Sequence, residues 1–103
     1  MRILLLGGSG SGKGTLGSWL RKVHELPLFS FGDEVRRIGS EDSALGQMLR
    51  NAYDPTLPYR PVPDPLSCLV FSKNVKGLTS YIYDGFPRTA AQATFVLQHH
   101  PPT

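Results

Sequence analysis

Residues 3–15 read ILLLGGSGSGKGT, an apolar run followed at once by a glycine-rich segment that ends in lysine, glycine and threonine. The apolar run is typical of a strand buried on both faces of a parallel sheet. After the glycines, apolar residues recur with helical spacing at Leu16, Trp19, Leu20 and Val23. We therefore expect an amphipathic helix whose stripe, Trp19 included, faces the core. A strand, a glycine loop and a helix in this order predict an α/β fold.

The glycine-rich segment has the spacing Gly-x-x-x-x-Gly-Lys of a phosphate-binding loop, from Gly7 to Lys13. Glycines let consecutive backbone N–H groups converge on a phosphate, and the following helix points its positive end at the same anion. Lys13 adds a full positive charge. A flexible linker has a similar composition, but a linker does not stand between a buried strand and an amphipathic helix. The hydroxyl that usually follows the lysine comes one residue later, at Thr15.

The rest of the chain continues the alternation of strand and helix. Two further strands are expected, at residues 28–30 and 81–83. Four further helices are expected, at residues 33–38, around 45–49, at 64–76, and from Thr89 to about 98. Asp33 is the expected cap of the first of these helices. Leu66, Leu69 and Val70 are the expected buried face of the helix at 64–76. The proline-rich residues 54–65 are expected to be mostly loop.

Size and charge restrict the class of protein. The chain has 103 residues, which suits one small domain, and a formal net charge of +3, which is too weak to indicate a nucleic-acid partner. The single cysteine, Cys68, allows no internal disulfide, and no apolar run is long enough for a signal peptide or a membrane span. We therefore expect a cytoplasmic protein without a membrane partner.

Three segments together resemble one family. Residues 10–15 read GSGKGT, residues 30–36 read SFGDEVR, and residues 84–89 read DGFPRT with Gln92 following. In this order and spacing they resemble the adenylate kinases and related nucleoside monophosphate kinases, in their N-terminal half only. The resemblance implies a P-loop α/β fold, a three-layer parallel sheet with flanking helices, incomplete at about three strands. It treats residues 1–103 as one such domain, with a monophosphate-binding arm at about 30–76 and with the lid and C-terminal core absent.

The family's strand order, second–third–first, would leave the first strand at an edge of the sheet. An apolar edge strand invites self-association.

The resemblance also implies site residues. Lys13 and Arg88 would be catalytic, and Asp84 would orient Mg²⁺ through water. The ATP phosphates would be bound by Gly8, Gly10, Ser11, Gly12, Lys13, Gly14 and Thr15. The nucleoside monophosphate would be bound by Phe31, Gly32, Arg36, Val62, Gly85, Arg88 and Gln92.

The implied reaction is transfer of the γ-phosphoryl group of Mg·ATP to a nucleoside monophosphate, with AMP as the expected acceptor, a step in nucleotide biosynthesis. Phe31 stands where the family usually has threonine. A phenylalanine offers a ring for stacking on a base but no hydrogen bond, so CMP, UMP and GMP stay open as acceptors. After Arg88 the sequence has no Arg or Lys, so it supports binding better than turnover.

Three interpretations follow from these features: an incomplete chain of such a kinase, a short protein that binds nucleotide without catalysis, or another P-loop phosphotransferase with a different small acceptor. The intact match at residues 84–89 argues against the third.

Overall fold

The computed structural model describes residues 1–7, 12–53, 56 and 62–101. In this part of the chain three parallel strands form one sheet in the order β1-β3-β2: β1 is Arg2–Leu5, β2 is Leu28–Ser30 and β3 is Tyr81–Asp84. The expected α/β fold and strand order are confirmed, and β1 lies at an edge of this sheet. Self-association through that edge stays a prediction.

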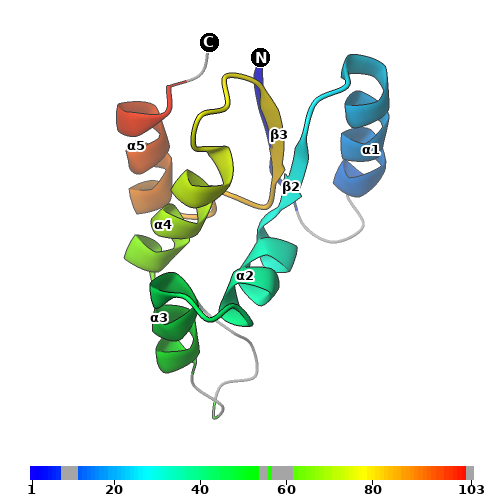
Figure 1. Ribbon diagram of the computed structural model, residues 1–103. Helices are drawn as coiled ribbons and strands as arrows, with labels where there is room; N and C mark the ends of the chain where they lie inside the picture. Colours follow the sequence, from blue (N-terminus) through cyan, green and yellow to red (C-terminus); the bar gives the residue numbers. More distant parts are fainter. Residues whose placement is uncertain (8–11, 54–55, 57–61, 102–103) are drawn as a thin grey trace.

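Five helices surround the sheet in the described residues. They are α1 (Lys13–His24), α2 (Phe31–Gly39), α3 (Ala44–Ala52), α4 (Asp64–Val75) and α5 (Ala90–His99). Figure 1 shows the strands between α1 on one side and α4 and α5 on the other, with α2 and α3 beyond the carboxyl ends of the strands. None of these helices has the length and apolar character that crossing a membrane requires.

Two helix starts differ from the sequence expectation. α2 begins at Phe31 and not near Asp33, because the chain leaves β2 and turns directly into the helix with Ser30 at the N-cap. Asp33 therefore lies inside the first turn, where its charge still favours the helix dipole. Likewise Asp64 is the first residue of α4 rather than its cap, which is Pro63. The cap at Thr89 is confirmed, since its hydroxyl accepts from the backbone N–H of Gln92.

The core is built on aromatic rings between α4 and β3. Phe71 of α4 is fully buried and packs on Phe86 with ring centroids 4.8 Å apart. Its edges meet the two tyrosines of β3, Tyr81 at 6.0 Å and Tyr83 at 4.7 Å. The face of α4 expected from the sequence is therefore partly wrong, because Leu69 is exposed and Phe71 takes the buried side. Phe71 takes the buried side because its ring packs edge-on against Tyr81 and Tyr83.

Helix α1 contradicts the expected orientation of its apolar stripe. Leu16, Trp19 and Val23 are all exposed, Trp19 at 57%, so the assignment of Trp19 to the core is wrong. The buried residue of α1 is Gly17. A Cβ at Gly17 would lie 2.9 Å from Cδ1 of Leu5, so the missing side chain lets the helix approach the sheet closely.

Candidate functional site

The three strands end at one edge of the sheet, just before the segments that carry the three sequence motifs. In the parallel register Leu5 of β1 and Ser30 of β2 both lie opposite Asp84, the last residue of β3. The chain therefore leaves the sheet at the same edge after Leu5, at the start of α2 and after Asp84. The crevice outside the carboxyl ends of parallel strands is where open α/β sheets bind ligands. The fold thus brings together three segments that are far apart in the sequence.

The start of α1 has the features of an anion site. Gly12 occupies the N-cap with φ of 82°, makes no side-chain cap hydrogen bond, and no acidic residue stands in the first turn. Ser43 and Thr89 cap α3 and α5 with side-chain oxygens, whereas α2 and α4, like α1, have no side-chain cap hydrogen bond. Uncapped N–H groups at a helix start are free to bind an anion. Of the other expected loop residues, Gly14 and Thr15 lie exposed in the first turn, and Gly8, Gly10 and Ser11 lie outside the described residues.

Lys13 is joined to the end of β3 by an ion pair that the sequence did not predict. Its Nζ lies 2.7 Å from Oδ1 of Asp84, and both side chains are largely shielded from solvent. The pair holds the ammonium group at the mouth of the sheet, beside the start of α1. A single carboxylate here also fits the way proteins bind Mg²⁺, through one or two carboxylates, water and substrate phosphates. In the residues that the structure describes, no cluster of three His, Cys, Asp or Glu forms a protein-only metal cage.

Arg36 and Arg88 each lie over a glycine. A Cβ added to Gly32 would lie 3.5 Å from Nη1 of Arg36, and one added to Gly85 would lie 3.1 Å from Nη2 of Arg88. Gly85 also has φ of 92°, which favours glycine, and its N–H donates to the carbonyl of Leu5 at 3.1 Å. Both glycines therefore give space to guanidinium groups, which suit phosphate oxygens.

The two arginines differ in their partners. Arg36 forms an exposed ion pair with Asp33 on its own helix, where solvent weakens the attraction. For Arg88 the described residues give no ion pair, and its side chain is exposed. A cation so placed is accessible to an anionic ligand.

Phe31 is held in the core. It is 9% exposed, and its ring stacks on Phe86 at 5.5 Å. Its Cβ would lie 3.5 Å from a Cβ added to Gly85. The ring is therefore turned toward the aromatic core and not open to a base. It packs the start of α2 against the segment that carries Arg88.

Gln92 is buried at 5% exposure, and both ends of its amide have partners. Its Oε1 accepts from the backbone N–H of Arg88 at 2.7 Å, and its Nε2 donates to Oδ1 of Asp64 at 2.8 Å. The same Asp64 oxygen accepts from the hydroxyl of Thr89 at 3.1 Å. Asp64 thus ties α4 to the start of α5, a contact that sequence reasoning missed.

A cavity of about 300 Å³ lies between α2 and α3. Two of the residues expected to bind the monophosphate, Arg36 and Val62, line it, while Gly85, Arg88 and Gln92 do not. The other lining residues are Val35, Gly39, Ser40, Leu49, Arg50, Ala52 and Tyr53. Its size and mainly apolar wall suit a flat organic group such as a nucleobase.

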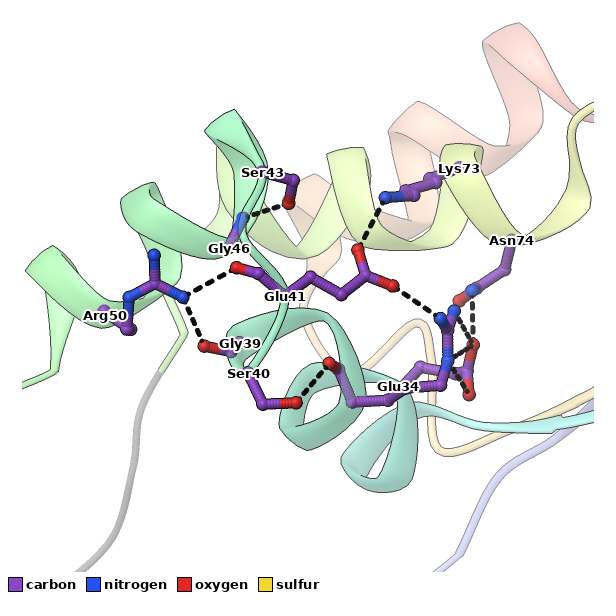
Figure 2. Close-up of polar contacts among 10 residues, drawn as sticks. Glu34, Gly39, Ser40, Glu41, Ser43, Gly46, Arg50, Lys73 and Asn74 are labelled. Carbon is purple, nitrogen blue, oxygen red and sulfur yellow. Dashed lines mark hydrogen bonds and ion pairs between the residues drawn. The ribbon is translucent and has the colours of Figure 1, made fainter.

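Polar contacts hold α2 in place below the sheet (Figure 2). The hydroxyl of Tyr83 donates to Asn74 at 2.7 Å, and Nδ2 of Asn74 donates to Glu34 at 2.6 Å. Glu34 also pairs with Arg37 on the same helix. Burial, together with the charge of Glu34, raises the pKa of Tyr83, so its hydroxyl stays protonated and keeps donating. A continuous chain of hydrogen bonds therefore links β3 through α4 to α2.

The turn between α2 and α3 is fastened in the same way. Glu41 accepts from Lys73 of α4 at 3.1 Å and from Arg37 at 2.7 Å. The hydrogen bond from Lys73, with the charges of both cations, lowers the pKa of Glu41 below its ordinary value. Arg50 of α3 donates to the carbonyls of Gly39 and Glu41, which satisfies the end of α2 (Figure 2). The helix that carries Arg36 is thus held from two sides.

Comparison with known proteins agrees with this arrangement. Residues 6–100 match the family described as AAA domain. The adenylate kinase of Buchnera aphidicola from Acyrthosiphon pisum (strain Tuc7) is 32% identical over 93% of this chain and 45% of that protein. The adenylate kinases of Buchnera aphidicola from Baizongia pistaciae and of Clostridium botulinum (strain Eklund 17B) are 35% and 38% identical, each over 90% of this chain and 43% of the relative.

The chain spans less than half the length of these curated relatives, while the match covers nearly all of the chain itself. The matched region, residues 6–100, contains the sequence positions of the glycine loop, Arg36, Arg88 and Gln92. The chain therefore belongs to the AAA domain family and is an adenylate kinase-like P-loop protein over almost its whole length.

Proposed function

We propose that this chain binds Mg·ATP and a nucleoside monophosphate, with AMP preferred, and that it serves transfer of the γ-phosphoryl group of ATP to AMP to give two ADP. The observation that carries the proposal is the register of the sheet, in which Leu5, Ser30 and Asp84 end at one level. This register supports the proposal, because the segments that lead to α1, α2 and Arg88 all leave the sheet at the same edge. Direct transfer of a phosphoryl group requires the two substrates to bind side by side with their phosphates close together.

The donor side is assigned to the start of α1. The free N–H groups after Gly12 and the ammonium of Lys13 would hold the β- and γ-phosphates of ATP. Asp84 would hold Mg²⁺ through water, and the ion would neutralise charge on the phosphates. The ion pair of Lys13 with Asp84 holds the ammonium group next to the carboxylate that would orient Mg²⁺.

The acceptor side is assigned to the arginines and to Gln92. Arg88 and Arg36 would grip the phosphate of AMP, because a guanidinium fork matches phosphate oxygens and keeps its charge at any working pH. Gln92 would read the base with its amide. The cavity that Arg36 and Val62 line, and that Gln92 does not, would give apolar walls to a part of the nucleotide that Gln92 does not contact.

A second candidate is nucleotide binding without turnover. It needs only the binding contacts of Lys13, Arg36 and Arg88, whereas phosphoryl transfer also relies on cations that neutralise the transition state. The two candidates share every contact assigned above. They differ only in whether ADP forms.

The test measures ADP formation from Mg·ATP and AMP by the purified chain, together with titration calorimetry for each nucleotide. We expect Arg88→Ala to weaken AMP binding by about tenfold or more and to leave ATP binding close to wild type. Lys13→Ala should do the reverse. Arg21→Ala is the control, since Arg21 is an exposed arginine in the last turn of α1, at the end away from the glycine loop.

Each result has a separate meaning. Equal losses for AMP and ATP in Arg88→Ala would reject the acceptor assignment, and unchanged ATP affinity in Lys13→Ala would reject the donor assignment. Binding of both nucleotides without ADP formation would favour the second candidate. ADP formation that disappears in Arg88→Ala would establish the kinase reaction.

A further inference from the structure

The outer edge of β1 has no neighbouring strand in the part of the chain that the structure describes. The carbonyls of Met1 and Leu5 accept from backbone N–H groups of β3. Because alternate residues bond to one neighbour in a parallel ladder, the backbone groups of Arg2 and Leu4 point to the open side. Unpaired backbone groups along an apolar strand are a template for another strand.

The exposed apolar side chains of α1 project over this same edge. Gly17 faces the sheet, since a Cβ there would lie 2.9 Å from Cδ1 of Leu5. Each helical residue advances by about 100°, so Leu16 and Val23 lie on one flank of α1 and Ser18 on the other. Crossovers between parallel strands are right-handed, and β2 lies beyond β3, so the flank with Leu16 is turned toward the open side of β1. Leu16 is 47% exposed and Val23 52%.

Helix α5 presents an apolar residue to the same side from the opposite face of the sheet (Figure 1). It runs antiparallel to the strands, since Arg2 at the start of β1 donates to the carbonyl of Pro101, just past the end of α5. Val96 is buried in the core, and Leu97 follows it about a quarter of a turn further round the helix. On this face of the sheet that rotation directs Leu97, which is 64% exposed, past β1.

The edge and the two helix flanks are self-complementary under one two-fold axis. An axis perpendicular to the sheet would pair β1 with β1 of a second copy as antiparallel strands, with Leu4 opposite its own counterpart. The same axis keeps the two copies of α1 on one face of the joined sheet, flank to flank, and the two copies of α5 on the other. A partner that adds only a strand would cover the edge and leave both helix flanks exposed.

The levels of α1 and β1 agree with a single axis. Gly17 lies over Leu5. Two residues further along α1 and one residue back along β1 are both steps of about 3 Å, so Trp19 stands level with Leu4. An axis through Leu4 therefore also passes the middle of α1.

The charges across such an axis are compatible with a second copy. Leu16 of one α1 faces Val23 of the other, and Arg2 faces Leu6, which is 58% exposed, rather than a second Arg2. The two copies of α1 run antiparallel, so their dipoles attract. Like charges placed directly opposite each other on paired strands are destabilising, and this register avoids them.

We propose that the open edge of β1, with the flanks of α1 and α5 that project past it, is a docking surface for a second copy of this chain. The resulting dimer has a continuous six-stranded sheet and is closed by its symmetry. The carboxyl ends of the two sets of strands point in opposite directions, so the candidate site of each copy stays open at its own end. The inference does not depend on the proposed function.

The test measures the mass of the full chain by sedimentation equilibrium over a range of concentrations. We expect the mass to rise from 11.3 kDa toward twice that value. The interface is small, so the dimer should dissociate in the micromolar range. Trp19 is the single tryptophan and is 57% exposed, so its fluorescence should shift to shorter wavelength over the same range of concentrations.

Two substitutions place a charge in the apolar flanks. Val23→Lys and Leu97→Lys should each weaken the dimer by about tenfold or more, because an unpaired charge is costly to bury. Ser18→Lys and Gln98→Lys are the matched controls, since both residues are exposed on other sides of the same helices. The controls should dimerise as the wild type does.

A third substitution tests the edge itself. Arg2→Pro removes the outward N–H at the first residue of β1, a position that tolerates proline. Arg2→Ala removes the same side chain and keeps the N–H. Only the proline variant should weaken the dimer.

The outcomes decide as follows. A chain that stays at 11.3 kDa at every concentration overturns the proposal, and the surface is then free for a different polypeptide. A dimer that Val23→Lys and Leu97→Lys leave unchanged also overturns it, because the contact then lies elsewhere, and so does growth beyond two copies. Circular dichroism checks that each variant is folded. If a lysine variant is not, the comparison of Arg2→Pro with Arg2→Ala decides: a weaker dimer in the proline variant alone supports the proposal, and equal dimerisation contradicts it.

Discussion

Substitution of Gly85, which lies beneath Arg88, tests how closely the residues around Arg88 are packed. Gly85 has φ of 92°, and a Cβ there would lie 3.1 Å from Nη2 of Arg88 and 3.5 Å from Cβ of Phe31. In Gly85→Ala we expect two separable effects. The left-handed backbone costs about 1–2 kcal/mol of unfolding free energy, and the new methyl group displaces the guanidinium of Arg88.

Gly77→Ala is the matched control for this prediction. Gly77 has φ of 78° but nothing within 4 Å of an added Cβ, so it carries the backbone cost without the contact. Both variants should lose about 1–2 kcal/mol in urea unfolding followed by circular dichroism. Only Gly85→Ala should weaken AMP binding, by up to about tenfold, since the methyl group shifts the guanidinium by a few tenths of an ångström and so weakens a charge-assisted hydrogen bond that contributes about 1.5–3 kcal/mol.

Titration calorimetry at a temperature where both variants are folded decides between the two effects. An AMP affinity in Gly85→Ala equal to that of the wild type would refute the reasoning, because it would mean that the position of Arg88 over Gly85 does not matter for binding. A Gly77→Ala variant that loses AMP as strongly would refute it in another way, by tracing the loss to stability.

Three further predictions concern the core and pH. Phe71→Ala should lower the unfolding free energy by about 3–5 kcal/mol in urea titrations, because the ring is fully buried against Phe86 and the tyrosines of β3. Trp19→Ala should change it by only about 0.5 kcal/mol, since that side chain is 57% exposed; a loss as large as that of Phe71→Ala would mean that the stripe of α1 is covered in solution. Burial, with the charges of Arg2 and His99, lowers the pKa of His100 in the folded state, so the unfolded state binds more protons as pH falls and stability drops below about pH 6.5. His100→Gln should reduce this drop between pH 7.5 and 5.5, whereas a reduction of the same size in the control His24→Gln would contradict the assignment.

The strands, the helices and their order along the chain could be predicted from the sequence, since they depend on local patterns. The strand at residues 28–30 and the helix start near Lys13 agree with the structure, because a short apolar run and a glycine-to-helix transition are visible over a few residues. The burial of α1 was not predictable in this way. Its spacing favours a buried stripe at Trp19, but contact with the sheet is made at Gly17, where the helix comes within reach of Leu5.

For the candidate site, motifs located the residues but not their partners. The glycine loop and residues 84–89 were recognisable as sequence, whereas the pairs Lys13–Asp84 and Asp64–Gln92 join residues that are 71 and 28 positions apart. The first pair depends on the register of the strands, and the second depends on how the start of α4 packs against the start of α5. Neither arrangement can be predicted from a local sequence pattern. The carboxylate of Asp64 in particular looks like an ordinary helix cap in the sequence.

The substitution at residue 31 illustrates how packing changes the meaning of a sequence difference. Phenylalanine in place of the family's usual threonine looks, in the sequence, like a change in base recognition. In the fold its ring stacks on Phe86, which in turn stacks on Phe71, so the ring extends the aromatic core to the start of α2. Because Phe86 stands two residues before Arg88, this stack packs the start of α2, the helix that carries Arg36, and the segment that carries Arg88 against the same aromatic core. The difference at residue 31 is therefore accounted for by packing, since the ring is 9% exposed and is not open for stacking on a base.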